Sequence, residues 1–158
     1  MKKKTSKHAP LDRSAIMRRV RSKDTTPELA VRRIISALGY RYRLHRKDLP
    51  GKPDIVFAAR KKIIFVNGCF WHGHHCRRGA RLPKENRDYW RSKIARNMER
   101  DKSNRAELRR NGWRVQTVWE CEILNFMKLE RTIEAFLSGK AAHNKALQPT
   151  SALTRRRG

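Results

Sequence analysis

The chain has 158 residues and carries 40 Lys and Arg against 14 Asp and Glu, a formal net charge of +26 at pH 7. This length suits one domain and excludes two well-cored ones, and no apolar run approaches the ~20 residues that cross a bilayer. A charge excess of this size favours a polyanionic partner, with nucleic acid as the leading candidate and an anionic membrane surface as the alternative. The basic start of the chain lacks the apolar segment of a signal peptide, so a cytoplasmic protein is expected.

Both ends of the sequence differ in composition from the interior. Residues 1–11 are basic and polar without periodicity, and residues 141–158 mix Asn, Gln, Pro, Ser and Arg. These patterns predict a disordered basic arm, a single domain over residues 12–140 and a disordered tail.

The interior predicts alternating helices and strands. Thr25 and Pro27 mark a helix start, and a helical apolar stripe follows as far as Gly39. Periodicity then predicts, in chain order, strands at 40–44, 53–57 and 62–66, a long helix at 85–110, a strand at 113–119 and a helix ending at 139. This order is typical of an α/β fold in which helices flank a central mixed sheet.

Three cysteines and several histidines form a metal-like pattern. An odd number of cysteines argues against a disulfide framework. Cys69, Cys76 and Cys121 with one imidazole would supply the Cys₃His set of a structural zinc site. The spacing leaves the imidazole open among three neighbours: His72, His74 and His75. The alternative is that the cysteines are small buried apolar side chains and the histidines are solvated.

Acidic residues are scarce, so each one is informative. Asp54 precedes an apolar strand, where a hard oxygen ligand would suit Mg²⁺, although a turn or capping role fits equally well. His72 has the pKa range of a general base that activates water, and its alternatives are a solvated or a zinc-binding histidine. Glu28, in the first turn of its predicted helix, is typical of an acid that offsets the helix macrodipole.

Aromatic residues interrupt this basic sequence. Phe70 and Trp71 are adjacent in a polar, glycine-containing loop, a presentation that suits wedges inserted between base steps. The alternative is that they pack beneath the metal loop. Trp90 has the same ambiguity because it also fits the apolar stripe of the long helix. The Lys and Arg residues of that helix favour phosphate contacts.

Three motifs combine these features: LPGKPDIV at 49–56, IFVNGCFWHGH at 64–74, and GWRV at 112–115 leading to VWEC at 118–121. Together they closely resemble the very short patch repair (Vsr) DNA mismatch endonuclease family, from about Ser14 to Phe136. The resemblance implies a restriction-endonuclease-like fold with a structural zinc site. It also implies a nick 5′ to the thymine of a T:G mismatch, the lesion left when 5-methylcytosine deaminates.

The resemblance assigns roles at matching positions. It implies that Asp54 binds the catalytic Mg²⁺ with the backbone carbonyl of Val66, that His72 is the general base and that Glu28 is a supporting acid. The zinc ligands that it implies are Cys69, His74, Cys76 and Cys121. The DNA contacts that it implies are wedge aromatics at Phe70, Trp71 and Trp90, an apolar pair at Met17 and Val20, and mismatch contacts at Lys93 and Asn97.

Two active-site positions depart from the family pattern. Val66 and Asn67 stand where a well-known member has Thr and His. The first change should matter little if only a carbonyl is used there. Asn67 donates a hydrogen bond but carries no charge, so we expect activity with slower chemistry.

The resemblance also implies the setting of the reaction. We expect a bacterial, nucleoid-associated monomer that acts on double-stranded DNA, with mismatch-repair proteins and a repair polymerase as partners. Two alternatives stay open. One is a sequence-specific nicking or restriction-type endonuclease that needs no mismatch, and the other is a catalytically weak, zinc-stapled DNA-binding module.

Overall fold

The computed structural model describes residues 23–139, so the predictions for Met17, Val20 and the two terminal segments lie outside the described residues. The helices are α2 (Thr26–Ala37), α3 (Arg87–Arg110) and α4 (Phe126–Ser138), and the strands are β1 (Arg43–Leu44), β2 (Ile55–Phe57), β3 (Lys62–Asn67) and β4 (Arg114–Trp119). Among residues 23–139, no helix combines the length and the apolar character needed to span a membrane.

The four strands form one mixed sheet in the order β1-β2-β3-β4. The first three strands are antiparallel neighbours, whereas β3 and β4 run parallel, with Val66 opposite Val118 and Asn67 opposite Trp119. Parallel neighbours require a crossover, and the segment containing α3 supplies it. The carboxyl ends of β3 and β4 therefore meet at one edge of the sheet.

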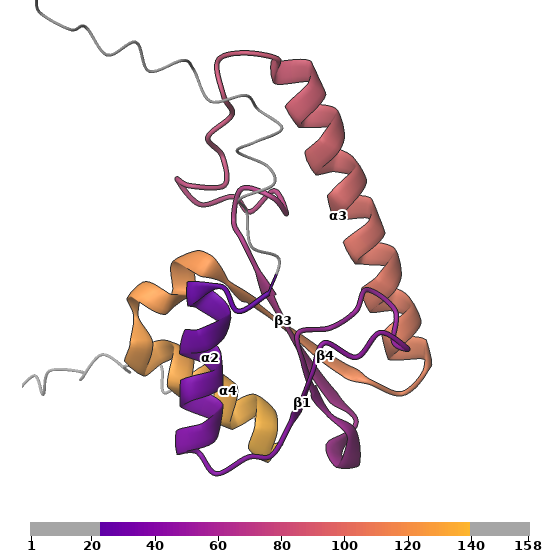
Figure 1. Cartoon of the computed structure of the whole chain (residues 1–158), viewed down its shortest axis with the longest axis vertical. Helices are drawn as coiled ribbons and strands as arrows, with labels where there is room; N and C mark the ends of the chain where they lie inside the picture. The colour runs from indigo at the N-terminus through magenta and orange to yellow at the C-terminus, as the bar shows by residue number, and fades with distance from the viewer. Residues whose placement is uncertain (1–22, 140–158) are drawn as a thin grey trace, which may run out of the picture.

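Helices cover both faces of this sheet, as the sequence predicts. On one face, α2 and α4 pack against Ile55, Phe57 and Ile64 in the larger buried cluster. On the other face, Val56 and Ile63 pack with Leu108 near the end of α3. Because neighbouring strand residues point to opposite faces, β2 and β3 contribute buried residues to both layers. Figure 1 shows α2 and α4 on one side of the strands and α3 on the other.

The start of α2 follows from its sequence. The Thr25 hydroxyl accepts a hydrogen bond from the Glu28 amide at 3.3 Å, and Pro27 lies in the first turn. The helix ends before Gly39, which has a φ of +76°. Val31, Ile34 and Ile35 form its buried face. This anchored helix fixes where Glu28 enters the molecule.

Several predicted boundaries differ from the structure. Helix α3 begins at Arg87 instead of residue 85, and Met98 on this helix is 46% exposed. Strand β1 is shorter than expected, and Tyr40 and Tyr42 before it pack edge-on against Phe57. Two short 3-10 helices, η1 (Ala58–Arg60) and η2 (Glu120–Leu124), follow β2 and β4.

Residues 68–86 connect β3 to α3 without a helix or strand. Gly73 brings this loop against α3, since a Cβ at this position would lie 2.4 Å from the Met98 sulfur. Its φ of +62° also favours glycine. Glycine at this position therefore lets the loop approach α3 closely.

Candidate active site and metal centre

A groove of about 890 Å³ opens where the carboxyl ends of the strands meet α3 and the loop at 68–86. The predicted site residues on its walls are Asp54, Val66, Asn67, Trp71, His72 and Lys93. Three further cations line it: Lys52, Arg100 and Arg105. The structure therefore brings the expected acid, base and basic residues to one cavity.

Asp54 lies immediately before β2, and its Oδ2 accepts a hydrogen bond from the Val66 amide at 2.8 Å. Burial raises the pKa of the Asp54 carboxyl, and the Val66 hydrogen bond opposes this effect. The negative charge of Glu28 raises this pKa further. Burial and the nearby negative charge both make the ionised carboxylate costly. A hard divalent cation bound to it would offset that cost. The donor chemistry of Asp54 and the Val66 carbonyl thus fits Mg²⁺.

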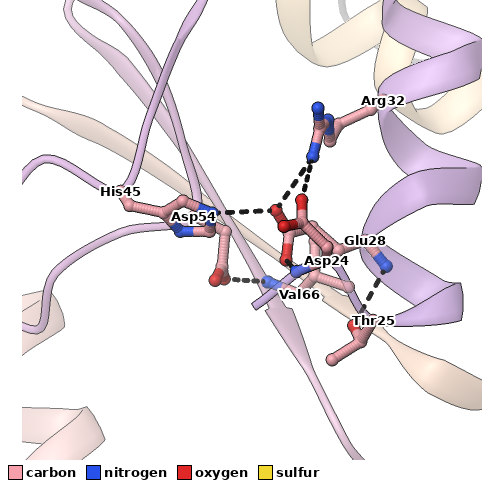
Figure 2. A network of polar contacts seen from close by, with 7 residues as sticks. All are labelled: Asp24, Thr25, Glu28, Arg32, His45, Asp54 and Val66. Carbon is pink, nitrogen blue, oxygen red and sulfur yellow. Dashed lines mark hydrogen bonds and ion pairs between the residues drawn. The ribbon is translucent and has the colours of Figure 1, made fainter. Parts of the chain in front are cut away.

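Glu28 is far more buried than a helix-capping acid needs to be, with only 2% of its surface exposed. Its Oε2 accepts a hydrogen bond from the Asp24 amide at 2.9 Å. Its Oε1 lies 3.2 Å from His45 Nε2 and 3.6 Å from Arg32 Nη1 (Figure 2). Glu28 therefore does more than offset the helix macrodipole, because it also contacts Asp24 and His45, which lie outside its helix.

This network has the spacing of a metal site but carries its own counter-charge. The ligand atoms of Asp24, Glu28 and His45 lie within 4.8 Å of one another. Arg32, however, places Nη1 2.6 Å from Asp24 Oδ1 and also faces Glu28. Because a guanidinium already balances these carboxylates, we interpret the cluster as a charge network beside the groove.

His72 is paired with an acid that the sequence did not assign to the site. Its Nδ1 contacts Asp101 Oδ2, and both side chains are mostly buried. Asp101 lies seven residues after Ile94, so it falls on the inward face of α3. An acid in helical register with the buried Trp90 and Ile94 was the available signal. With Nδ1 directed at Asp101, Nε2 is the nitrogen left to accept a proton.

Replacing Asp101 by Asn should therefore slow the nicking that the family resemblance implies by about tenfold or more, because the imidazole loses the carboxylate that fixes its tautomer. DNA affinity should stay within about twofold, as measured by single-turnover kinetics and equilibrium binding. Asp88→Asn is the matched control, since this acid on the same helix has a fully solvated side chain, 98% exposed. Equal rates for the two variants would contradict a positioning role for Asp101.

The second centre gathers the three cysteines and one histidine. The ligand atoms of Cys69, His74, Cys76 and Cys121 lie within 4.8 Å of one another. The structure thus selects His74 for this cluster and directs His72 to the groove. Three thiol groups and an imidazole are a structural zinc set that leaves no coordination position for chemistry.

The surroundings of this cluster fix its ligands. The His74 ring stacks on Trp119 with centroids 4.3 Å apart, and its Nδ1 lies 3.5 Å from Cys121 Sγ. Burial raises the pKa of Cys69 to about 12, whereas a hydrogen bond from the Gly79 backbone lowers the pKa of Cys76 to about 6. A Cβ on Gly79 would lie 1.9 Å from the His74 carbonyl oxygen, so only glycine fits there.

The aromatics expected to contact DNA form one cluster beside the groove. The rings of Phe70, Trp71 and Trp90 meet edge-on with centroids 5.0 to 5.9 Å apart. Trp90 is only 6% exposed, whereas Phe70 and Trp71 are half-buried. Lys93 Nζ lies 5.6 Å from the centre of the Trp71 ring, and Asn97 Nδ2 donates to the Trp71 carbonyl at 3.0 Å. Trp90, Lys93 and Asn97 thus support the two more accessible rings, and their contacts with DNA stay predictions.

The mixed sheet, the groove at its edge and the flanking helices define a restriction-endonuclease-like fold. The structure is similar to the catalytic domain of the homing endonuclease I-Bth0305I, with a TM-score of 0.53 and 23% identity. The match covers 73% of this chain and 96% of that domain. This similarity confirms the predicted fold class.

Sequence comparison narrows the class to one family. The family model described as DNA mismatch endonuclease Vsr matches residues 5–78. The type II nicking enzyme V.XorIIP of Xanthomonas oryzae is 51% identical over 84% of this chain and 97% of its own length. The DNA mismatch endonuclease Vsr of Escherichia coli is 35% identical over 85% of this chain and 89% of its own length. The chain belongs to the Vsr family of DNA endonucleases.

Proposed function

We propose that this endonuclease nicks one strand of duplex DNA 5′ to the thymine of a T:G mismatch. The observation that carries the proposal is the shared groove, in which Asp54 and the His72–Asp101 pair face a space lined by Lys and Arg. Mismatch selectivity is supported by the family description and by the accessible Phe70–Trp71 pair. A mismatched step costs less to unstack than a paired one, so an aromatic wedge would itself discriminate.

Each groove residue has a defined part in the proposed hydrolysis. Asp54 and the Val66 carbonyl would hold Mg²⁺, which when bound neutralises charge on the scissile phosphate. His72 Nε2 takes the proton of the attacking water, because Asp101 holds Nδ1. Lys52, Arg100 and Arg105 bind phosphates along the groove. The buried Asn67 stands at the end of β3, where it offers hydrogen bonding without charge.

A second function is favoured by the names of similar proteins. V.XorIIP and the type II nicking enzyme V.NmeAIP of Neisseria meningitidis, which is 47% identical over 72% of this chain and 80% of its own length, are both named as nicking enzymes. A sequence-specific nick without a mismatch is therefore the alternative. In either case one groove cuts one strand, so a monomer suffices. Mismatch-repair proteins and a repair polymerase in the cytoplasm are the partners that a mismatch-specific nick would require.

A nicking assay separates these functions. The substrate is an end-labelled duplex with one T:G pair in a cytosine-methylation context, beside its matched T:A duplex. Mg²⁺ is added or omitted, and chelators are avoided because they would also remove zinc. A Mg²⁺-dependent nick 5′ to the mismatched thymine, at least about 100-fold faster than in the matched duplex, is expected. Equal cutting of both duplexes would favour the sequence-specific alternative, and binding without cutting would indicate a DNA-binding module.

A further inference from the structure

His45 contacts the Glu28 side chain and the Asp54 backbone. Its backbone amide donates to the Asp54 carbonyl oxygen at 3.0 Å, which continues the pairing of β1 with β2. Its Nε2 reaches Glu28 Oε1 at 3.2 Å (Figure 2). The residue has a φ of +47°, a backbone conformation that is uncommon outside glycine. One residue thus connects the segment that carries Asp54 to the side chain of Glu28.

Glu28 depends on this contact because its carboxylate is buried without a full set of hydrogen bonds. Its Oε2 is satisfied by the Asp24 amide, whereas Oε1 accepts no hydrogen bond among the described residues. Oε1 has only ion-pair contacts, with His45 at 3.2 Å and Arg32 at 3.6 Å. A buried carboxylate oxygen that loses a partner becomes costly to keep in place. Without the imidazole, the more distant Arg32 would be left to hold Oε1.

Arg32 and His45 hold Glu28 from two different elements. Arg32 comes from α2 itself, four residues after Glu28, and it also pairs with Asp24. His45 follows β1 and is hydrogen-bonded to the segment that carries Asp54. Of these two contacts, that of His45 fixes Glu28 relative to Asp54, because only His45 is attached to the Asp54 segment.

We propose that His45 is a positioning residue for the nicking reaction. It acts by holding the Glu28 carboxylate at a fixed position relative to Asp54. The proposal rests on the proposed function of the groove. It requires the polar Nε2 contact with Glu28 Oε1 and the attachment of His45 to the Asp54 segment. A Gln side chain can offer an N–H donor at a similar reach, whereas Leu fills similar space and offers none.

The first experiment compares His45→Gln with His45→Leu in single-turnover nicking of the duplex that the wild-type enzyme cuts. His45→Leu should nick about tenfold more slowly and need a higher Mg²⁺ concentration for half-maximal rate, whereas His45→Gln should stay within about threefold of wild type. DNA affinity, zinc content and melting temperature should be nearly unchanged. Lys47→Ala, an exposed residue of the same loop, is the matched control and should keep the wild-type rate at saturating enzyme.

The second experiment repeats His45→Leu in a Glu28→Gln background. If His45 acts through Glu28, the two effects are not additive, and His45→Leu should slow the Glu28→Gln enzyme less than about twofold. A full tenfold loss in that background would overturn the proposal, and so would a Gln variant as slow as the Leu variant. If the Leu variant melts early, His45→Asn replaces it, because Asn is polar but too short to reach Glu28.

Failure of this proposal is distinguishable from failure of the proposed function. If Asp54→Ala nicks at the wild-type rate, the groove is not the active site. If Asp54→Ala is inactive and His45→Leu nicks at the wild-type rate, the groove is still the active site and only the role proposed for His45 is wrong.

Discussion

Replacing Asp54 by Ala is expected to reduce the single-turnover nicking rate by about 1,000-fold or more, while affinity for duplex DNA changes by less than about threefold. Asp54 is the acid that directly contacts the backbone of β3 in the groove, so its loss removes the proposed metal ligand. The basic residues that bind phosphates are unaffected. The measurement is a nicking time course at saturating enzyme, beside a binding titration at fixed salt.

Removing the charge of Asp54 is expected to raise stability even though it abolishes nicking. Burial raises the pKa of Asp54 above its value in the unfolded chain. The stability that this group contributes is therefore present below the unfolded pKa and is lost as pH rises through the folded pKa. At neutral pH without Mg²⁺, Asp54→Asn should melt at a higher temperature than wild type although it does not nick. Asp48→Asn, which alters an exposed acid paired with Arg46, is the control for both measurements. Nicking that survives the loss of Asp54 would contradict its catalytic role.

Replacing Cys121 by Ser is expected to remove zinc and nicking together. Cys121 lies in η2, whereas the other three ligands lie in the loop after β3, so it ties that loop to the end of β4. Without a full ligand set, the loop that carries His72 has few buried apolar contacts to hold it. We expect less than one tenth of wild-type zinc and a melting temperature lower by roughly 10 °C or more, since structural zinc supplies folding free energy directly.

Metal analysis, thermal melting and nicking assays test this expectation in the same preparation. His75→Ala is the matched control, because His75 is exposed and contacts the His74 ring but is not part of the cluster. It should keep zinc and activity. A Cys121→Ser protein with one full equivalent of zinc would show that the ligand assignment is wrong.

The elements of the fold were largely predictable because their signals are local. A hydroxyl cap and Pro27 mark α2, and the apolar runs mark β2 and β3. The parallel pairing of β3 with β4 has no local signal and was not predicted. The 3-10 helix η2 was missed as well, because Glu120–Leu124 lacks both a full helical repeat and strand alternation.

The candidate site was predictable as a set of residue types but not as a set of contacts. Cysteine spacing indicated the metal cluster, yet only the fold separates His74 from His72, since His72, His74 and His75 lie in one loop. The His72–Asp101 pair joins residues 29 positions apart. The buried Glu28 carboxylate contacts His45, which follows a different element. Such pairs arise from the packing of distant segments, and one sequence holds no direct record of that packing.

The parallel pairing of β3 with β4 also makes the two ends of these strands different. The groove and the cysteine cluster lie at the end where these strands finish, and the hairpin turn at η1 lies at the end where β3 starts. Five strand steps separate the two ends, about 17 Å. The η1 residues are exposed, so a fluorophore or surface tether attached at Ala59 would not obstruct the groove. A label at this site would therefore allow single-molecule measurements of DNA binding.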